Sequence, residues 1–180
     1  MNWNDYLIYN PMTGDLTWKE RSRDEFTDER AWRAWNTRFS GISAGKRDMK
    51  KGRPRAINVK YLGKAYLAHR IIWTMVNGQI PSGLFIDHIN RDPWDNRLAN
   101  LRLATNAENL RNRRMNANNT SGYKGVNRTP YNTFEAQITI NNRKITLGYF
   151  ATPELAHEAY CSAAKIYHGE FAGATAHNKN

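Results

Sequence analysis

The chain has 180 residues and a formal net charge of +11, from 27 Lys or Arg against 16 Asp or Glu. This length holds one domain or two small ones, and the positive field favours a polyanion such as nucleic acid. A ribosomal or merely soluble basic protein has a similar composition. The single cysteine, Cys161, excludes an intrachain disulfide and a thiolate zinc cluster. With no apolar run of membrane-spanning length and no signal-peptide pattern, we expect a cytoplasmic protein without a membrane partner.

The first part of the sequence predicts a hairpin, a helix, a basic hairpin and a second helix. Two short apolar runs between residues 7 and 18 flank an Asn-Pro and Thr-Gly turn signal, which indicates a hairpin. Residues 28–38 have a weak helical pattern. Residues 46–70 carry nine Lys or Arg and one Asp in strand-like alternation, which predicts a basic hairpin. Apolar residues then recur at helical spacing from about residue 67, and Asn77-Gly78 predicts the end of that helix.

The middle of the sequence predicts the local order strand, strand, helix. The two strand candidates are residues 84–90 and 98–103, and the turn-rich segment 91–96 joins them. Thr105 and Glu108 have the spacing of a capping box, so a helix is expected to start there and to run to about Arg114.

The C-terminal part predicts a second small module. We place a polar, turn-rich linker at residues 116–120. Residues 123–129, 133–140 and 143–150 are strand candidates, and Thr152-Pro153 is a good start for a helix. The helix face expected to lie against this three-stranded sheet carries Ala156, Ala159, Tyr160, Ala163, Ala164 and Tyr167.

The candidate chemical residues lie in the middle segment. Hydrolysis of a phosphodiester needs a base that activates water and a divalent metal that stabilises the leaving oxygen. His88 is the candidate base, and Asp87 and Asn109 offer the oxygen ligands that Mg²⁺ or Mn²⁺ prefers. The carbonyl of Asn100 is expected to hold the His88 ring in its reactive tautomer. An Asp-His pair alone is more often a turn with a capped carboxylate.

The spacing of several motifs favours the chemical interpretation, because together they resemble the HNH endonucleases of phages and mobile introns. The resemblance covers at least residues 67–113. The motifs are His69-Arg70-Ile71-Ile72-Trp73, Ile80-Pro81, Ile86-Asp87-His88-Ile89-Asn90, Asp95-Asn96-Arg97, Asn100-Leu101-Arg102 and Thr105-Asn106-Ala107-Glu108-Asn109.

The resemblance implies a ββα-metal fold, one divalent metal and a product with a 5′ phosphate. The resemblance also implies two catalytic residues, with His88 as the general base and Asn100 as the structural asparagine. It implies that Asp87 and Asn109 are the metal ligands. Asn109 stands where many members have a third histidine, as in the H-N-N subgroup. The cysteine pairs that bind zinc in some relatives are absent, so no zinc is expected.

For three further polar residues, a structural role is weighed against a role at the candidate site. His69 shares a helical stripe with apolar residues, so it has either a structural role or, with Arg70, a contact to a phosphate near the site. Asn96 and Asn112 are expected to be turn and helix-surface polar groups rather than ligands.

The C-terminal segment, about residues 120–173, resembles AP2/ERF-type DNA-binding domains through Ser121-Gly122-Tyr123-Lys124-Gly125-Val126, Glu135-Ala136-Gln137-Ile138 and Leu147-Gly148-Tyr149-Phe150. In that family the sheet lies in the major groove and the helix covers its other face. Plant members have Arg or Trp at several of these positions, so no target sequence is transferred. The residues expected to bind DNA are Lys124, Asn127, Arg128, Thr129, Tyr131, Gln137, Thr139, Lys144 and Thr146.

The sequence therefore predicts an α+β protein with an HNH nuclease domain at 1–115, a linker at 116–120 and an AP2/ERF-like domain at 121–175. The expected function is metal-dependent cleavage of double-stranded DNA by a homing or nicking endonuclease, acting as a monomer or homodimer in the host cytoplasm if phage-encoded. One alternative is a non-catalytic DNA-binding regulator that keeps the nuclease fold as a scaffold, and a second is an RNA-binding protein.

Overall fold

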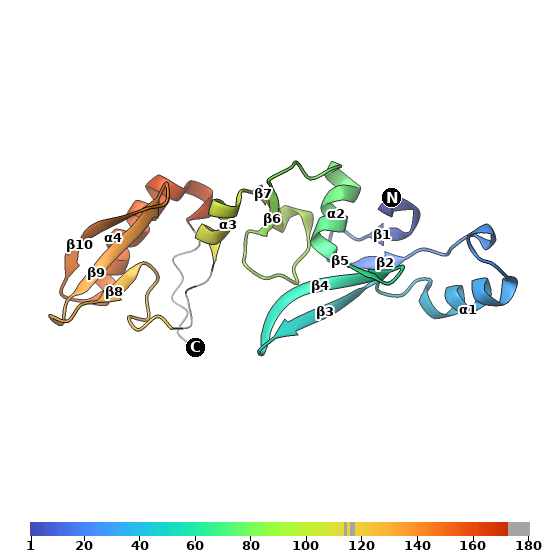
Figure 1. The fold of residues 1–180 in the computed structure, drawn as a ribbon, viewed down its shortest axis with the longest axis horizontal. Coiled ribbons are helices and arrows are strands. Elements are labelled where there is room, and N and C mark those ends of the chain that lie inside the picture. The colour runs from blue at the N-terminus through green and yellow to red at the C-terminus, as the bar shows by residue number, and fades with distance from the viewer. Residues whose placement is uncertain (114, 116–117, 173–180) are drawn as a thin grey trace. The chain divides into compact units, whose positions relative to one another are not determined.

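The computed structural model describes residues 1–113, 115 and 118–172. The chain consists of two compact units, Met1–Thr105 and Asn106–Asn180 (Figure 1). None of the helices described is long and apolar enough to cross a membrane.

The first unit combines three small antiparallel sheets with two helices (Figure 1). The sheets have the strand orders β1-β2, β3-β4-β5 and β6-β7. The elements are η1 (Trp3–Asp5), β1 (Leu7–Tyr9), β2 (Leu16–Trp18), η2 (Arg23–Glu25), α1 (Glu29–Phe39), β3 (Gly45–Lys50), β4 (Arg53–Tyr61), β5 (Lys64–Leu67), α2 (Ala68–Asn77), β6 (Phe85–His88), η3 (Leu98–Asn100) and β7 (Leu101–Ala104). The predicted N-terminal hairpin and both helices are confirmed. The predicted basic hairpin is instead a three-stranded sheet, because the chain turns again at Leu62 and Gly63 and adds β5 to β4.

Local sequence signals explain where these helices begin and end. The Asp28 side chain accepts a hydrogen bond from the amide of Ala31 at 2.7 Å, which caps the N-terminus of α1. Helix α2 ends at Gly78, whose φ of 80° belongs to the left-handed region.

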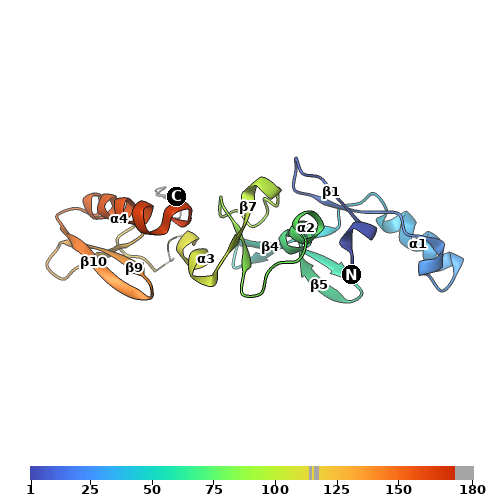
Figure 2. The same ribbon diagram turned by 90° about the horizontal axis from the view of Figure 1, so that it is seen from above.

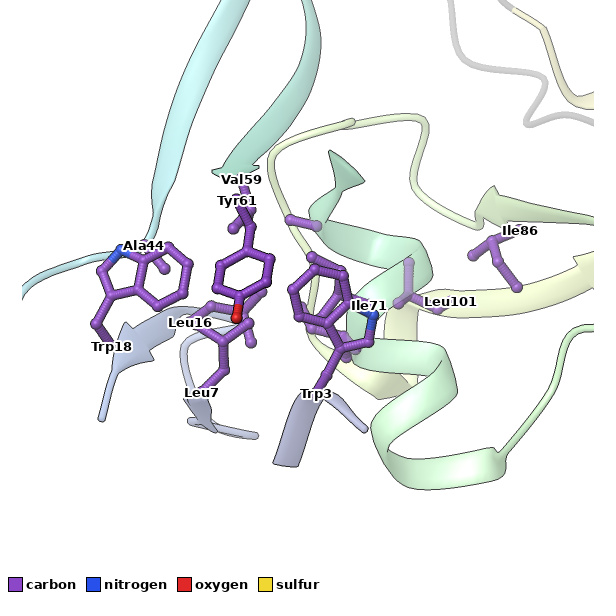
Figure 3. Packing of buried hydrophobic residues seen from close by; sticks show 12 residues of the cluster. Trp3, Leu7, Leu16, Trp18, Ala44, Val59, Tyr61, Ile71, Ile86 and Leu101 are labelled. Atoms are coloured by element: carbon purple, nitrogen blue, oxygen red, sulfur yellow. The ribbon is translucent and has the colours of Figure 1, made fainter. Parts of the chain in front are cut away.

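The hydrophobic core of the first unit joins the N-terminal hairpin to the strands of the candidate site. Figure 3 shows this cluster, which runs from Trp18 and Leu16 on β2 to Ile86 on β6 and Leu101 on β7. Val59 and Ile72 are completely buried. Since each fully buried side chain of this size contributes about 1.5–3 kcal/mol, the core fixes the two strands β6 and β7 against the rest of the unit.

The second strand of the candidate site begins later than predicted. A strand was expected over residues 98–103, but the structure has the 3-10 turn η3 followed by β7 at Leu101–Ala104. The reason is that the backbone carbonyl of Asn100 accepts from the amide of Ile89, and its side chain bonds to Asn90. These bonds close the connecting loop, so regular pairing starts only at His88 and Leu101.

The second unit contains an antiparallel sheet with the strand order β10-β9-β8 and a helix, α4, along one face (Figure 2). Its elements are α3 (Asn106–Asn112), β8 (Val126–Arg128), β9 (Phe134–Ile140), β10 (Arg143–Phe150), α4 (Pro153–His168) and η4 (Gly169–Phe171). The predicted three strands and helix are confirmed. The Thr152 side chain caps α4 by accepting from the amide of Leu155 at 3.4 Å.

Helix α3 belongs to the second unit, whereas sequence analysis placed residues 106–115 in the first domain. One physical reason is that the ammonium group of Lys124 donates to the carbonyls of Arg111 and Arg113 just where this helix ends. Within the predicted linker, residues 116 and 117 lie outside the described residues, as does residue 114, the predicted end of the helix.

The buried face of α4 differs from the predicted face at its C-terminal end. Ala156, Tyr160 and Ala164 are buried as expected, but Tyr167 is 57% exposed. The stripe continues from Ala164 to His168, four residues later, which is buried and contacts the carbonyl of Thr139 through Nε2 at 3.1 Å. The expectation for Tyr167 was therefore wrong.

Packing between β8 and α4 gives a test of the second unit. Gly125 has a φ of +77°, and a Cβ atom there would collide with the ring of Tyr160. Gly122 has the same φ with nothing within 4 Å of such an atom, so Gly122→Ala adds only left-handed strain, about 1–2 kcal/mol. We expect Gly125→Ala to destabilise the protein by about 1–3 kcal/mol more than Gly122→Ala, because it also overpacks the contact. Calorimetric unfolding of both variants checks this, and equal losses would contradict the packing.

Candidate functional site

The candidate site is built on the end of β6 and the loop that follows it. Asp87 and His88 are the last two residues of this strand, and Arg102 lies directly opposite Asp87 on β7. Nε and Nη2 of Arg102 both lie 2.9 Å from Oδ2 of Asp87. Since the Asp87 side chain is only 6% exposed, this paired guanidinium fixes the orientation of a carboxylate that would be costly to bury alone.

The ring of His88 is held by Asn96. Nε2 of His88 lies 3.0 Å from Oδ1 of Asn96, and Asn96 is only 1% exposed. Because an amide oxygen only accepts, this contact places the hydrogen of the neutral ring on Nε2 and its lone pair on Nδ1. Asn96 was expected to be a turn polar group rather than a ligand, and it does lie in this loop, but its contact to His88 was not predicted. Asn112, expected on a helix surface, is also buried, at 3% exposed.

The side chain of Asn100 binds the loop that follows β6. Its Oδ1 accepts from the amide of Asn90 at 2.9 Å, and its Nδ2 donates to Oδ1 of Asn90 and to the carbonyl of Asp95. The loop is therefore tied to the base of β7 on both sides. Asn100 stays the predicted structural asparagine, and the contact to the His88 ring that was expected from Asn100 comes from Asn96 instead.

A second set of bonds stiffens the middle of the same loop. Asp95 accepts from Asn90 at 2.8 Å and is paired with Arg97, whose Nη2 lies 2.6 Å from Oδ2. The hydrogen bond from the Arg97 side chain is the main cause that lowers the pKa of Asp95 to about 2. Asp95 thus keeps its charge, and this part of the loop keeps its bonds, over the whole physiological pH range.

His69 on α2 packs directly against the candidate base. The ring centroids of His69 and His88 are 5.1 Å apart, with an interplanar angle of 86°. Burial, followed by the neighbouring His88 and Arg70, lowers the pKa of His69 to about 3. His69 is therefore neutral at physiological pH, which favours the structural interpretation over a charged phosphate contact. Arg70 is exposed on the same helix, and its phosphate contact stays a prediction.

The N-terminal hairpin also contacts the loop that carries Asn96. The hydroxyl of Tyr9 accepts from the amide of Leu98 at 2.8 Å and donates to the carbonyl of Asn96 at 3.3 Å. Gly14, in the turn between β1 and β2, is buried, and a Cβ atom there would lie 2.6 Å from the Arg97 nitrogen and 2.7 Å from the Asn96 carbonyl carbon. The turn therefore presses against the peptide that carries Asn96.

The two predicted metal ligands belong to different units. Asp87 is fixed in the first unit, with both Arg102 contacts on Oδ2, whereas Asn109 lies on α3 of the second unit. The carboxylate and amide oxygens of these two side chains suit a hard divalent cation. Among the residues described, no group of three or more His, Cys, Asp or Glu is arranged to hold a metal ion. Two oxygen ligands from the protein therefore remain the predicted set.

Five of the nine predicted DNA-binding residues of the second unit lie on the sheet face opposite α4. Gln137 pairs with Thr146, and Thr139 pairs with Lys144, so these four share a face. The neighbouring strand adds Asn127, which donates to Oε1 of Gln137 at 3.4 Å. The buried Ala136 and Ile138 alternate with them and face the helix.

The remaining predicted DNA-binding residues have other surroundings. Lys124 is engaged with the carbonyl groups at the end of α3. Arg128 donates to Oδ1 of Asn132 at 2.9 Å and pairs with Phe134, which packs on the helix side of the sheet. Thr129 and Tyr131 lie in the turn before β9, where Tyr131 is 87% exposed. DNA contact by these residues stays a prediction.

A known protein family matches the segment that contains the candidate site. Residues 66–111, about a quarter of the chain, match the model of a family described as HNH endonuclease. This segment contains β6, the loop and β7, together with His69 and Asn109. No solved structure matches the chain.

Two curated viral proteins are similar to parts of the chain. A protein named Uncharacterized HNH endonuclease L560, from Acanthamoeba polyphaga mimivirus, is 36% identical over 112 residues, which are 62% of this chain and 57% of that protein. Protein 3.8 of Escherichia phage T7 is 45% identical over 67 residues, which are 37% of this chain and 55% of that protein. The chain thus spans little more than half the length of either relative.

The neutral state of His69 predicts a pH dependence of stability. With a folded pKa of about 3 against an ordinary value of 6.5, the unfolded chain binds a proton that the folded chain does not. This contribution is complete above pH 6.5 and is lost by up to about 1.4 kcal/mol per pH unit as the pH falls toward 3. NMR titration of the imidazole signals, with His69→Gln to assign the resonance, is expected to show no His69 transition between pH 7 and 4. A midpoint near 6.5 would contradict the buried contact.

Proposed function

We propose that this chain is a metal-dependent endonuclease that hydrolyses phosphodiester bonds in double-stranded DNA, of the homing or nicking type. The observation that carries the proposal is the half-buried His88, held by Asn96 and adjacent to the Asp87–Arg102 pair. A purely structural hairpin has no need for a tethered histidine beside a buried carboxylate. The HNH match over the same segment supports this interpretation.

In the proposed reaction, His88 removes the proton from a water molecule that attacks phosphorus. With Nε2 donating to Asn96, the neutral ring accepts this proton on Nδ1, and the resulting imidazolium keeps its bond to Asn96. The new oxygen–phosphorus bond forms as the bond to the 3′ oxygen breaks, so the phosphate stays on the 5′ end. The amide of Asn96 thus fixes both the tautomer and the direction of the base.

Asp87 and Asn109 would hold one divalent cation, Mg²⁺ or Mn²⁺. When bound, this ion supplies positive charge that stabilises the developing charge on the phosphate and on the 3′ leaving oxygen. The protein's contribution is orientation, because Arg102 fixes the carboxylate of Asp87 before any ligand arrives.

We further propose that the C-terminal unit binds duplex DNA through the outer face of its sheet, as in AP2/ERF-type domains. Support comes from the polar side chains Asn127, Gln137, Thr139, Lys144 and Thr146, which share the face that α4 leaves uncovered. Their amide and hydroxyl groups both donate and accept, which suits contact with base edges and phosphates.

Cleavage of supercoiled plasmid by the purified chain tests the nuclease proposal. We expect nicking or linearisation with Mg²⁺ or Mn²⁺, none with EDTA, and a loss of at least about 100-fold in His88→Ala, since a general base contributes 10²–10⁴-fold. Gel electrophoresis over time measures both rates.

The matched control is Lys165→Gln, an exposed residue on α4 far along the sequence from the site. DNA binding without cutting under either metal, and with binding reduced in a Gln137→Ala Lys144→Ala double variant, would instead identify a non-catalytic regulator.

The contact between the N-terminal turn and this loop predicts a rate effect at a residue that never touches substrate. Gly14→Ala pushes against the Asn96–Arg97 peptide, so we expect a drop of about tenfold or more in nicking rate at saturating DNA, with little change in affinity. Gly41→Ala is the control, because Gly41 has a similar φ of +76° and nothing within 4 Å. Equal rates in the two variants would show that the turn does not position Asn96.

A further inference from the structure

The hairpin formed by β3 and β4 carries the densest exposed positive charge of the first unit. Between residues 46 and 55 six side chains are Lys or Arg, and all six are exposed. The single acidic residue of this segment, Asp48, lies 3.4 Å from Arg55 in an exposed ion pair. The basic side chains are Lys46, Arg47, Lys50, Lys51, Arg53 and Arg55.

The hydrophobic core does not explain why residues 46–55 form a projecting hairpin. The hydrophobic core of the first unit includes Ala44 before this segment and Val59 after it, with Ile57 packed against the core, but no described core cluster includes a residue from 46 to 55. The two strands project from the unit as a paired ribbon (Figure 1). A projection that adds charge repulsion and no apolar burial costs stability, which points to a role in binding.

The hairpin is a defined shape rather than a loose loop. Its strands stay paired from Gly45 with Val59 to Lys50 with Arg53. At the tip, Lys51 and Gly52 have φ values of 50° and 73°, the two positive angles of a tight hairpin turn. The charges are therefore presented in fixed positions, which lowers the entropy cost of binding.

One basic residue links this hairpin to the candidate site. Arg47 pairs with Ile57, whose side chain packs against the core, so Arg47 lies on the same face of the ribbon. Its guanidinium carbon is 4.9 Å from the ring centroid of Trp94. Trp94 belongs to the loop that carries Asn96, so the base of the hairpin contacts the loop that orients His88.

We propose that the β3–β4 hairpin is a docking arm for the phosphate backbone of duplex DNA, next to the phosphate that is cut. The inference rests on the proposed nuclease function, which supplies the polyanion. The five residues of Lys46–Lys50 extend about 17 Å at ~3.3 Å per residue. Phosphates of one strand recur every ~3.4 Å along the duplex axis, so the arm lies beside about five of them.

The test compares two variants that remove the same amount of charge. The first is Lys50→Gln Lys51→Asn Arg53→Gln at the tip, with Asn at position 51 because it adopts positive φ readily. The control is Arg30→Gln Lys64→Gln Lys165→Gln, three exposed residues elsewhere in the chain. Circular dichroism and thermal unfolding check that both full-length proteins fold.

Binding of a 30-base-pair duplex is measured by fluorescence anisotropy in EDTA at several salt concentrations, so that cleavage plays no part. Each lost phosphate contact reduces the slope of log affinity against log salt by about 0.9. We expect the tip variant to lose at least tenfold in affinity at low salt and up to about three units of slope, and the control to stay within threefold of wild type.

Two results would overturn the docking arm: equal losses in both variants, or tighter binding of duplex RNA through the same tip residues. Neither depends on whether the wild type cuts plasmid, so failure of the nuclease proposal is recognised separately.

Discussion

The loop from residue 89 to residue 97 has no regular secondary structure, so its polar groups must find partners among their neighbours. Asn100 supplies partners at the base of β7, Asp95 and Asn90 supply them within the loop, and Tyr9 supplies one from the N-terminal hairpin. Because these bonds come from three parts of the unit, they fix the position of Asn96. The hydrogen bond to Asn96 in turn fixes the orientation of the His88 ring. The geometry of the candidate base is therefore a property of the whole first unit.

The sequence predicts the local elements well because their signals are local. The adjacency of Asp87 and His88, the turn at Asn77-Gly78 and the Thr152 cap all act within a few residues, and the structure has the strands and helices there. Strand alternation also places Gln137 and Thr139 on one face. Strand alternation does not predict that Tyr149 lies on this face as well. A bulge after Thr146 shifts the register and brings Tyr149 opposite Glu135.

The contacts that determine the candidate site are less accessible from the sequence, because they join distant residues. Nothing near Tyr9 indicates that its hydroxyl meets the amide of Leu98, 89 residues later. The role of Arg102 follows only from the register that sets it opposite Asp87. Lys124 shows the same limit in the second unit: its charge is visible in the sequence, but its carbonyl partners at the end of α3 are not.

The bond between Tyr9 and Leu98 also has a consequence for the order in which the protein folds. Strands β1 and β2 leave the ribosome before β6 and β7, yet the hydroxyl of Tyr9 gains its partner Leu98 only after 89 further residues have been made. Closing so long a segment is entropically slow compared with forming either hairpin alone. The bond that ties the N-terminal hairpin to the loop of the candidate base is therefore expected to form late in the folding of the first unit.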